Sequence, residues 1–182
     1  LGKLTVYDHR EMAKACRDLQ GKIAHCLEAK GANPDGVYYL VPFAEKSYGL
    51  INTAYRHANN VSADRFVTPE QLGSLKGDAT VIVLDDFAGT GESVERVYSA
   101  VRNHFGGDII FGNLVCTDYA AERMTQGRTL THGSGCFDSE DVKMAQNRHT
   151  SFERCSFLTT RIVETYDTGE LPLDTQQRLK HY

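Results

Sequence analysis

One stretch of the chain, VIVLDDFAGTGES, runs from Val81 to Ser93 and decides both the expected fold and the expected ligand site. Its first four residues form a continuous apolar run, which is typical of a strand buried on both faces of a parallel sheet. Asp85 and Asp86 follow directly, at the end of the strand where open α/β sheets bind ligands. Because two ionised neighbours repel each other, we expect them to be solvated, hydrogen-bonded to ligand hydroxyls or close to a divalent cation.

The second half of this stretch has the features of an anion site. Gly89 and Gly91 allow a ligand to approach the main chain closely, and Thr90 and Ser93 supply hydroxyl groups. Apolar residues then recur at helical spacing: Val94, Val97, Tyr98 and Val101. The first-turn N–H groups and the dipole of that helix would face the loop. One end of the site therefore suits a diol or a metal ion, and the other suits a phosphate.

The stretch allows three interpretations other than a ligand site. A solvated acidic turn followed by a helix cap explains each feature singly but not their combination. An ATPase strand with a terminal acid is excluded, because the chain contains no G-x-x-x-x-G-K-[ST] sequence. An acidic phospho-acceptor pocket on a flavodoxin-like fold remains open, although it would not explain the Gly-Thr-Gly loop.

The stretch resembles the phosphoribosyl-diphosphate (PRPP) signature of type I phosphoribosyltransferases, with Gly89 where the family usually has Thr. The resemblance implies a catalytic pair, Asp85 and Asp86, that binds the ribose hydroxyls, partly through Mg²⁺ and water. It also implies a loop whose backbone N–H groups cradle the 5-phosphate. That loop comprises Ala88, Gly89, Thr90, Gly91, Glu92 and Ser93. The implied partners are PRPP or a nucleotide and a second substrate that the sequence does not identify.

A second segment fits the same resemblance. The pattern predicts a strand over 37–41, a loop over 42–47 and a helix over 48–59. In the family, the loop in this position binds pyrophosphate. Its counterparts here are Ala44, Glu45, Lys46 and Ser47. Lys46 is either a contact for the diphosphate or a solvated lysine, and Glu45 is a poor neighbour for a polyanion unless it binds Mg²⁺ or turns away.

The segment before the signature strand departs from the family. Only residues 61–80 are available, and they must include a short strand near 65–67 and a helical turn capped by Thr68 and begun by Pro69. Little chain is left for the lid that excludes water in active members. Two functions from different classes therefore stay open: a transferase, and a non-catalytic module that senses PRPP or a nucleotide within a larger protein or complex.

Composition sets the broad class. The chain has 182 residues, 41% hydrophobic and 24% charged, with a net charge of −4 and a pI near 6.0. These values indicate one ordinary globular domain, make nucleic acid an unlikely partner and give no membrane span. The five cysteines lie without C-x-x-C spacing, which favours buried thiols in a reducing cytoplasm. A partner domain or a homo-oligomer remains open.

Strands and helices are expected to alternate along the chain. After a helix that Asp8 and Glu11 would cap, strands near 65–67, 80–84 and 108–116 and helices 93–104 and 119–126 predict a doubly wound parallel sheet, with its core about 36–127. Asp118 is the expected N-cap of the helix over 119–126. The variable region 128–182 is expected to add a strand over 129–136, a helix from Ser139 and a buried helix over 152–163.

Overall fold

The computed structural model describes residues 8–42, 46–125, 152 and 154–163. The strands are β1 (Val37–Leu40), β2 (Phe66–Val67), β3 (Thr80–Ala88), β4 (Asp108–Thr117) and β5 (Cys155–Val163). The α-helices are α1 (His9–Ala29), α2 (Lys46–Asn59), α3 (Glu92–Arg102) and α4 (Asp118–Thr125). Short 3-10 helices are η1 (Pro34–Gly36), η2 (Ala63–Arg65) and η3 (Pro69–Ser74).

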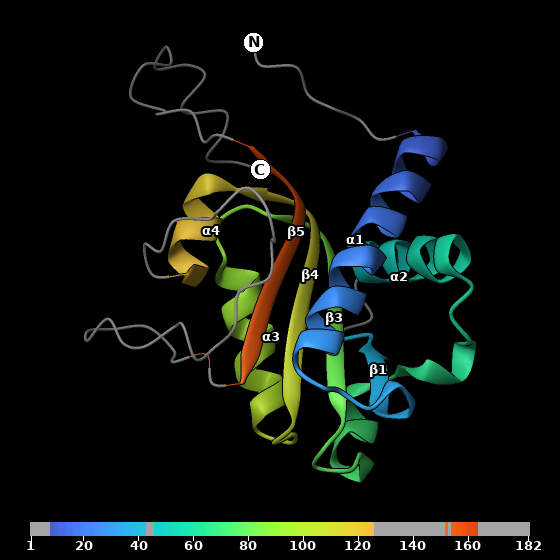
Figure 1. Ribbon diagram of the computed structural model, residues 1–182. Coiled ribbons are helices and arrows are strands. Elements are labelled where there is room, and N and C mark those ends of the chain that lie inside the picture. Colours follow the sequence, from blue (N-terminus) through green and yellow to red (C-terminus); the bar gives the residue numbers. More distant parts are fainter. Residues whose placement is uncertain (1–7, 43–45, 126–151, 153, 164–182) are drawn as a thin grey trace.

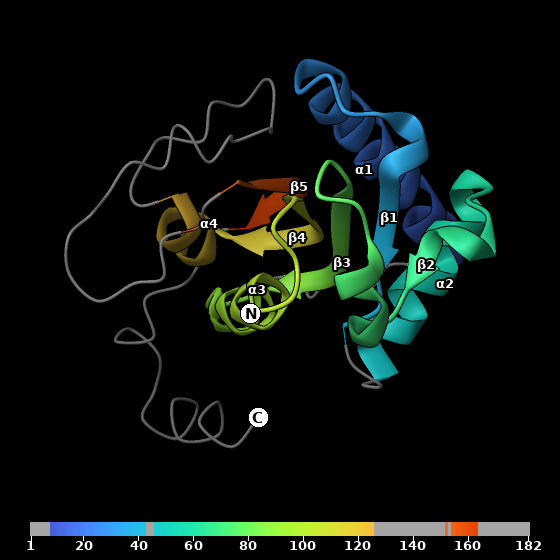
Figure 2. The ribbon, with the colours of Figure 1, turned by 90° about the horizontal axis from the view of Figure 1, so that it is seen from below.

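The strands form one parallel sheet in the order β2-β1-β3-β4-β5. Helices α1 and α2 cover one face, and α3 and α4 cover the other (Figure 1). The view along the strands in Figure 2 shows β2 at one edge and β5 at the other. This is the predicted doubly wound α/β sheet. Because the chain goes from β1 outward to β2 and then returns to β3 on the other side of β1, the strand order reverses between β1 and β3.

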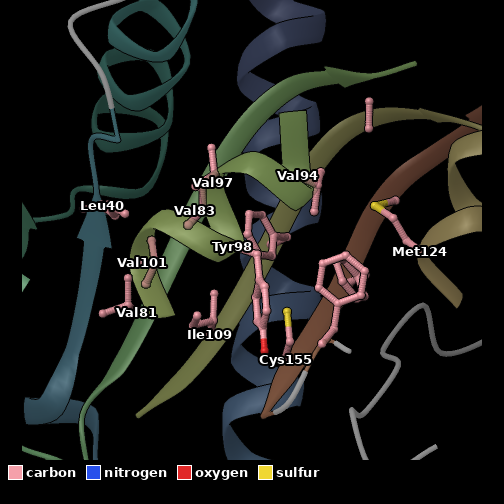
Figure 3. Packing of buried hydrophobic residues seen from close by; sticks show 14 of the residues in the cluster. Leu40, Val81, Val83, Val94, Val97, Tyr98, Val101, Ile109, Met124 and Cys155 are labelled. Atoms are coloured by element: carbon pink, nitrogen blue, oxygen red, sulfur yellow. The ribbon is translucent and has the colours of Figure 1, made fainter. Parts of the chain in front are cut away.

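Two apolar cores lie on the two faces of the sheet. Val81 and Val83 pack against α3, whereas Ile82 and Leu84 pack against α1 and α2. Figure 3 shows the first core, in which Val94, Val97, Tyr98 and Val101 of α3 lie over β3 and β4. Alternate residues of a strand point to opposite faces, so a strand covered on both sides must be apolar throughout. This explains the unbroken apolar run before Asp85.

The start of α1 follows the predicted capping box. The Asp8 carboxylate accepts hydrogen bonds from the N–H groups of Arg10 and Glu11, both at 2.8 Å. The Glu11 carboxylate accepts one from the Asp8 N–H at 3.1 Å. These bonds satisfy donors that the first turn of a helix otherwise leaves unpaired.

The prediction of a buried helix over 152–163 is wrong, because Cys155–Val163 is strand β5. β5 pairs in parallel with β4, with Cys155 opposite Ile109 and Val163 opposite Thr117. A short apolar run has no clear period, so β-branched content should have decided in favour of a strand. The strand expected over 129–136 and the helix expected from Ser139 lie outside the described residues.

The described helices and cysteines bear on two further expectations. Among the described residues, no helix is long and apolar enough to cross a membrane. Four cysteines are buried and free of disulfide bonds: Cys16, Cys26, Cys116 and Cys155. The fifth, Cys136, lies outside the described part of the chain.

Candidate ligand site

Strand β3 continues through the acidic pair, which therefore lies within the strand and not after it, as the predicted boundary of 80–84 would have it. Asp85 stands in register with Asn113 of β4. Asp85 is 9% exposed, whereas the next residue, Asp86, is exposed. The strand holds one carboxylate in the interior and presents the other to solvent, next to the point where the strand order reverses.

No neighbouring side chain among the described residues balances the charge of the acidic pair. The Asp85 carboxylate accepts a hydrogen bond from the Asp86 N–H at 3.0 Å. Burial is the largest cause that raises the pKa of Asp85 from 3.8 to about 7, and the hydrogen bond and the charge of the Asp86 side chain contribute to the same rise. Within the described residues, no lysine or arginine forms an ion pair with either carboxylate. A cation or a set of hydroxyl donors would relieve this unfavourable arrangement.

Two carbonyl groups of the loop after β3 are bound by residues from the end of β4 and from α4. The Thr117 hydroxyl donates to the Gly89 carbonyl at 2.5 Å, and Arg123 Nη1 donates to the Thr90 carbonyl at 3.2 Å. Arg123 is itself fixed by two bonds to the Glu95 carboxylate, at 3.0 and 2.8 Å. The loop is therefore tied to α4 on one side and to α3 on the other.

Thr117, and not Asp118, supplies the N-cap of α4, which corrects the prediction. The Thr117 hydroxyl accepts a hydrogen bond from the Ala120 N–H at 3.0 Å, which is the geometry of an N-cap bonded to the third helical residue. Asp118 is the first residue of α4, and its carboxylate accepts from the Tyr119 N–H at 2.7 Å. One hydroxyl thus caps α4 and anchors the neighbouring loop.

The loop also presents backbone donors. Gly91, the N-cap of α3, has φ 76° in the left-handed region that favours glycine. The Glu92 N–H is directed to the Thr90 hydroxyl at 3.4 Å. In the described part of the chain, no protein acceptor lies within hydrogen-bonding distance of the N–H groups of Thr90, Gly91 or Ser93. Unpaired N–H groups at a helix start form an anion site.

The remaining members of the predicted phosphate loop contribute in different ways. Ala88 is fully buried at the end of β3, so only its backbone is available. Ser93 is half-buried in the first turn of α3. Glu92 is exposed, and its carboxylate lies 3.7 Å from Arg123 Nη1. The negative charge of Glu92 next to an anion site is thereby partly offset.

The structure gives a reason for glycine at position 89. A Cβ atom built on Gly89 would lie 2.9 Å from Cε1 of Phe87, which is shorter than ordinary carbon contacts. Phe87 is 52% exposed, and its ring lies against the loop. Any side chain at 89 would displace that ring. Gly89 stands where the family usually has Thr, and its lack of a side chain leaves room for the Phe87 ring.

The predicted pyrophosphate loop is described only in part. Ala44 and Glu45 lie outside the described residues. Lys46 and Ser47 form the start of α2, two residues earlier than predicted, and their side chains are not described. The segment nevertheless follows β1, and β1 is paired with β3. The ends of the two strands flank the point at which the strand order reverses.

The segment between α2 and β3 is occupied by short elements, as its length suggested. Residues 63–74 form η2, β2 and η3, and Leu72 of η3 is buried. Arg65 lies at the amino end of the strands, where its Nη1 donates to the Asp35 carbonyl at 2.6 Å. Arg65 is therefore a structural residue at the amino end of the sheet, opposite the end at which the acidic pair lies.

An apolar cavity of about 180 Å³ lies between α3 and η3, apart from the acidic pair. Its walls include Leu40, Leu72, Val97, Val101 and His104. Of the predicted site residues that the structure describes, none lines it. Two residues outside the sequence motif, Thr117 and Arg123, bind carbonyls of the loop. Neither is among the site residues predicted from the sequence, and Arg123 carried no local signal.

Comparison with known proteins gives structural matches only. No protein-family model matches the chain, and no curated protein matches it. A hypoxanthine-guanine phosphoribosyltransferase from Schistosoma mansoni, in complex with IMP, is 12% identical with a TM-score of 0.44; the match covers 62% of this chain and 59% of that enzyme. A hypothetical protein from Neisseria gonorrhoeae with bound ppGpp is 12% identical with a TM-score of 0.46, over 96% of this chain and 94% of that protein.

An orotate phosphoribosyltransferase from Aeropyrum pernix is 16% identical with a TM-score of 0.42, over 96% of this chain and 79% of that enzyme. These matches are weak, and the resemblance to type I phosphoribosyltransferases rests on the motif from Val81 to Ser93. At these identities and TM-scores, a function has to be inferred from the residues of the site. In its motif from Val81 to Ser93, the chain is similar to type I phosphoribosyltransferases.

Proposed function

We propose that the chain is a phosphoribosyltransferase-type domain that binds PRPP or a nucleotide together with Mg²⁺. The observation that carries the proposal is one juxtaposition at the end of β3. Two carboxylates without a cationic partner among the described residues are followed within five residues by a loop with unpaired N–H groups. A ribose 5-phosphate has the complementary groups, since its hydroxyls suit carboxylates and its phosphate suits amide donors.

The acidic pair fits Mg²⁺ in the manner usual for phosphate substrates. Mg²⁺ keeps several waters and is bound by one or two carboxylates together with substrate phosphates. The described residues contain no group of three or more acidic, histidine or cysteine ligands, and this mode does not need one. Asp85 and Asp86 would hold the ion, and the ion would neutralise charge on the diphosphate.

The transfer itself requires mainly positioning. A nitrogen nucleophile would form a bond to the anomeric carbon while the bond from that carbon to the diphosphate oxygen breaks. Pyrophosphate would leave with the electron pair, and the nucleophile would lose a proton to solvent. The contribution of this chain is to fix the ribose at Asp85 and Asp86 and the 5-phosphate at Thr90 to Ser93.

Isothermal titration calorimetry with PRPP tests the proposal. We expect saturable binding that requires MgCl₂ and is lost in excess EDTA. Ribose 5-phosphate should bind more weakly, since it lacks the diphosphate. A folded protein that binds neither compound at about millimolar concentration, the weakest affinity that such a site is expected to show, would reject the proposal.

A second function is favoured by one observation, the short connection between β2 and β3. The 3-10 helix η3 uses residues 69–74, which leaves only residues 75–79 before β3. A lid that closes over the reacting centre needs more chain than this. The second candidate is therefore a module that binds PRPP or a nucleotide without transfer. Incubation with PRPP, Mg²⁺ and a panel of purine and pyrimidine bases separates the two, because only a transferase releases pyrophosphate.

A further inference from the structure

We propose that Thr117, at the end of β4, and Arg123, on α4, are positioning residues that orient the phosphate loop. The inference rests on the proposed function, which it deepens by naming the residues that orient the amide donors. The sequence motif contains neither residue. They lie 28 and 33 positions from the carbonyls that they bind.

The orientation follows from the geometry of the peptide bond. In a trans peptide, the carbonyl and the next residue's N–H point in opposite directions. The Gly89 carbonyl is directed to the Thr117 hydroxyl at 2.5 Å, so the Thr90 N–H is directed away from α4. The Thr90 carbonyl is directed to Arg123 Nη1 at 3.2 Å, so the Gly91 N–H is directed away as well. Two successive N–H groups fixed in this way form a concave anion site.

The guanidinium of Arg123 is fixed in position by the Glu95 carboxylate. Two of its nitrogens bind the Glu95 carboxylate at 3.0 and 2.8 Å, which leaves Nη1 for the loop. This two-point pairing is the strong and directional form of an Arg–carboxylate contact. The Arg123 side chain is 21% exposed and that of Glu95 is 20% exposed. The contact is therefore partly shielded from water.

The packing of Gly91 supports the same role for α4. A Cβ atom built on Gly91 would meet Met124 Cγ at 3.6 Å, Arg123 Cδ at 3.7 Å and the Ala120 carbonyl at 3.9 Å. The backbone of the loop thus rests directly on α4. Since Gly89 provides no hydroxyl for a phosphate, the loop depends on its oriented N–H groups, and these depend on Thr117 and Arg123.

The experiment compares ligands that use different parts of the site. Ribose 5-phosphate probes the loop, whereas Mg²⁺-pyrophosphate probes the acidic pair and the segment after β1. We expect Arg123→Ala to weaken ribose 5-phosphate binding about tenfold, the effect of one lost hydrogen bond of about 1.4 kcal/mol, and to leave Mg²⁺-pyrophosphate binding unchanged. A merely structural role would weaken both ligands together.

Arg65→Ala is the matched control. Arg65 also donates to a backbone carbonyl, that of Asp35 at 2.6 Å, and it pairs with the Asp35 carboxylate at 3.5 Å. Arg65→Ala removes the same charge as Arg123→Ala, but at the amino end of the sheet. Its ribose 5-phosphate affinity should equal that of the wild type. An equal loss in Arg65→Ala and Arg123→Ala would overturn the inference, because it would reflect net charge alone.

Thr117 gives a second test that does not depend on the stability of Arg123→Ala. Thr117→Val removes the hydroxyl and keeps the shape, and Thr117→Ser restores the hydroxyl. We expect Val to weaken ribose 5-phosphate binding and Ser to rescue it. In ¹⁵N–¹H spectra, the wild type and the Ser variant should show ligand-dependent downfield shifts of the Thr90 and Gly91 amide protons, and the Val variant should not.

The outcomes separate the two proposals. Wild-type protein that binds neither ribose 5-phosphate nor PRPP overturns the proposed function and this inference with it. Wild-type protein that binds both, with unchanged affinity in Arg123→Ala and in Thr117→Val, overturns only the inference. Selective loss of ribose 5-phosphate binding, with rescue by Thr117→Ser, supports it.

Discussion

The two ends of the parallel sheet differ in how their polar groups are used. At the amino end, arginines bind carbonyls and carboxylates of the protein itself. Arg154 binds both oxygens of Asp108, at 3.1 and 3.2 Å, and Arg102 donates to the Gly107 carbonyl at 2.6 Å. At the carboxyl end of β3, Asp85 and Asp86 have no cationic partner among the described residues.

Under the proposed function, this difference separates polar groups that hold the fold from those that bind a ligand. A paired group contributes to stability, and its loss is measured in the free energy of unfolding. A group left without a partner costs stability, and such a cost is typical of functional sites. Substitutions at the amino end should therefore lower stability without changing ligand binding, whereas substitutions at the carboxyl end should weaken ligand binding.

The largest effect is expected for the double substitution Asp85→Asn with Asp86→Asn. Both side chains keep their size and lose the charge that holds Mg²⁺ and the ribose hydroxyls. Calorimetry should detect no Mg²⁺-dependent PRPP binding at ligand concentrations that saturate the wild type. Circular dichroism should show an unchanged fold. An unfolded double variant would assign the pair a structural role and remove the contrast between the two ends.

The next effect concerns the pH dependence of stability. Burial raises the folded-state pKa of Asp85 from 3.8 to about 7, so the native state holds a proton that the unfolded chain has released. The stabilisation is complete below about pH 4 and is lost as the pH rises through about 7, by about 2–4 kcal/mol at 1.36 kcal/mol per unit.

Asp85→Asn removes this titration and supplies the measurement. Urea unfolding at low and at neutral pH should show that the variant gains stability relative to the wild type as the pH rises. The same comparison for Asp108→Asn serves as the control at the amino end. If the difference in the free energy of unfolding between wild type and Asp85→Asn stays constant with pH, burial does not raise the pKa of Asp85.

A smaller effect is expected for Gly91→Ala, because φ 76° is unfavourable for any residue with a Cβ atom. The expected loss of stability is about 1–2 kcal/mol, read from urea unfolding. Gly31→Ala is the matched control, with φ 61° and no atom within 4 Å of a Cβ at that position. Both variants should lose stability, but only Gly91→Ala should also weaken PRPP binding. Equal binding in the two would place the loop outside the site.

The smallest effect is expected for Arg154→Ala. Arg154 binds Asp108 and donates to the Gly106 carbonyl at 3.1 Å. Because its side chain is 53% exposed, solvent screening limits the expected loss of stability to about 1 kcal/mol. Thermal unfolding provides the measurement, and PRPP affinity should not change. A fall in affinity would show that the two ends of the sheet are coupled.

Much of the fold could be predicted from the sequence, because local signals and the fold agree. The Asp8–Glu11 capping box and the apolar stripe of α3 specify their elements without help from distant residues. The unbroken apolar run before Asp85 indicates a strand covered on both faces. Where these signals are strong, long-range packing only confirms them.

The sequence-based predictions failed where a strand, a cap or a site residue depends on contacts with residues far away in the sequence. β5 forms because Cys155 to Val163 pairs with β4, some 46 residues earlier in the chain, and its own period does not distinguish strand from helix. Thr117, and not Asp118, is the N-cap of α4, and its hydroxyl also binds the Gly89 carbonyl, a contact with a residue 28 positions away. Arg123 reaches the loop only because the fold brings α4 beside it. Single-sequence patterns carry no information on such contacts.

The most direct test of the central claim is a crystal structure of the protein with PRPP and Mg²⁺. The 5-phosphate should accept hydrogen bonds from the N–H groups of Thr90, Gly91 and Ser93, and the ribose hydroxyls should lie against Asp85 and Asp86. The diphosphate should lie toward the segment after β1. A ligand bound elsewhere, for example in the cavity between α3 and η3, with the loop amides left unbound, would contradict the account.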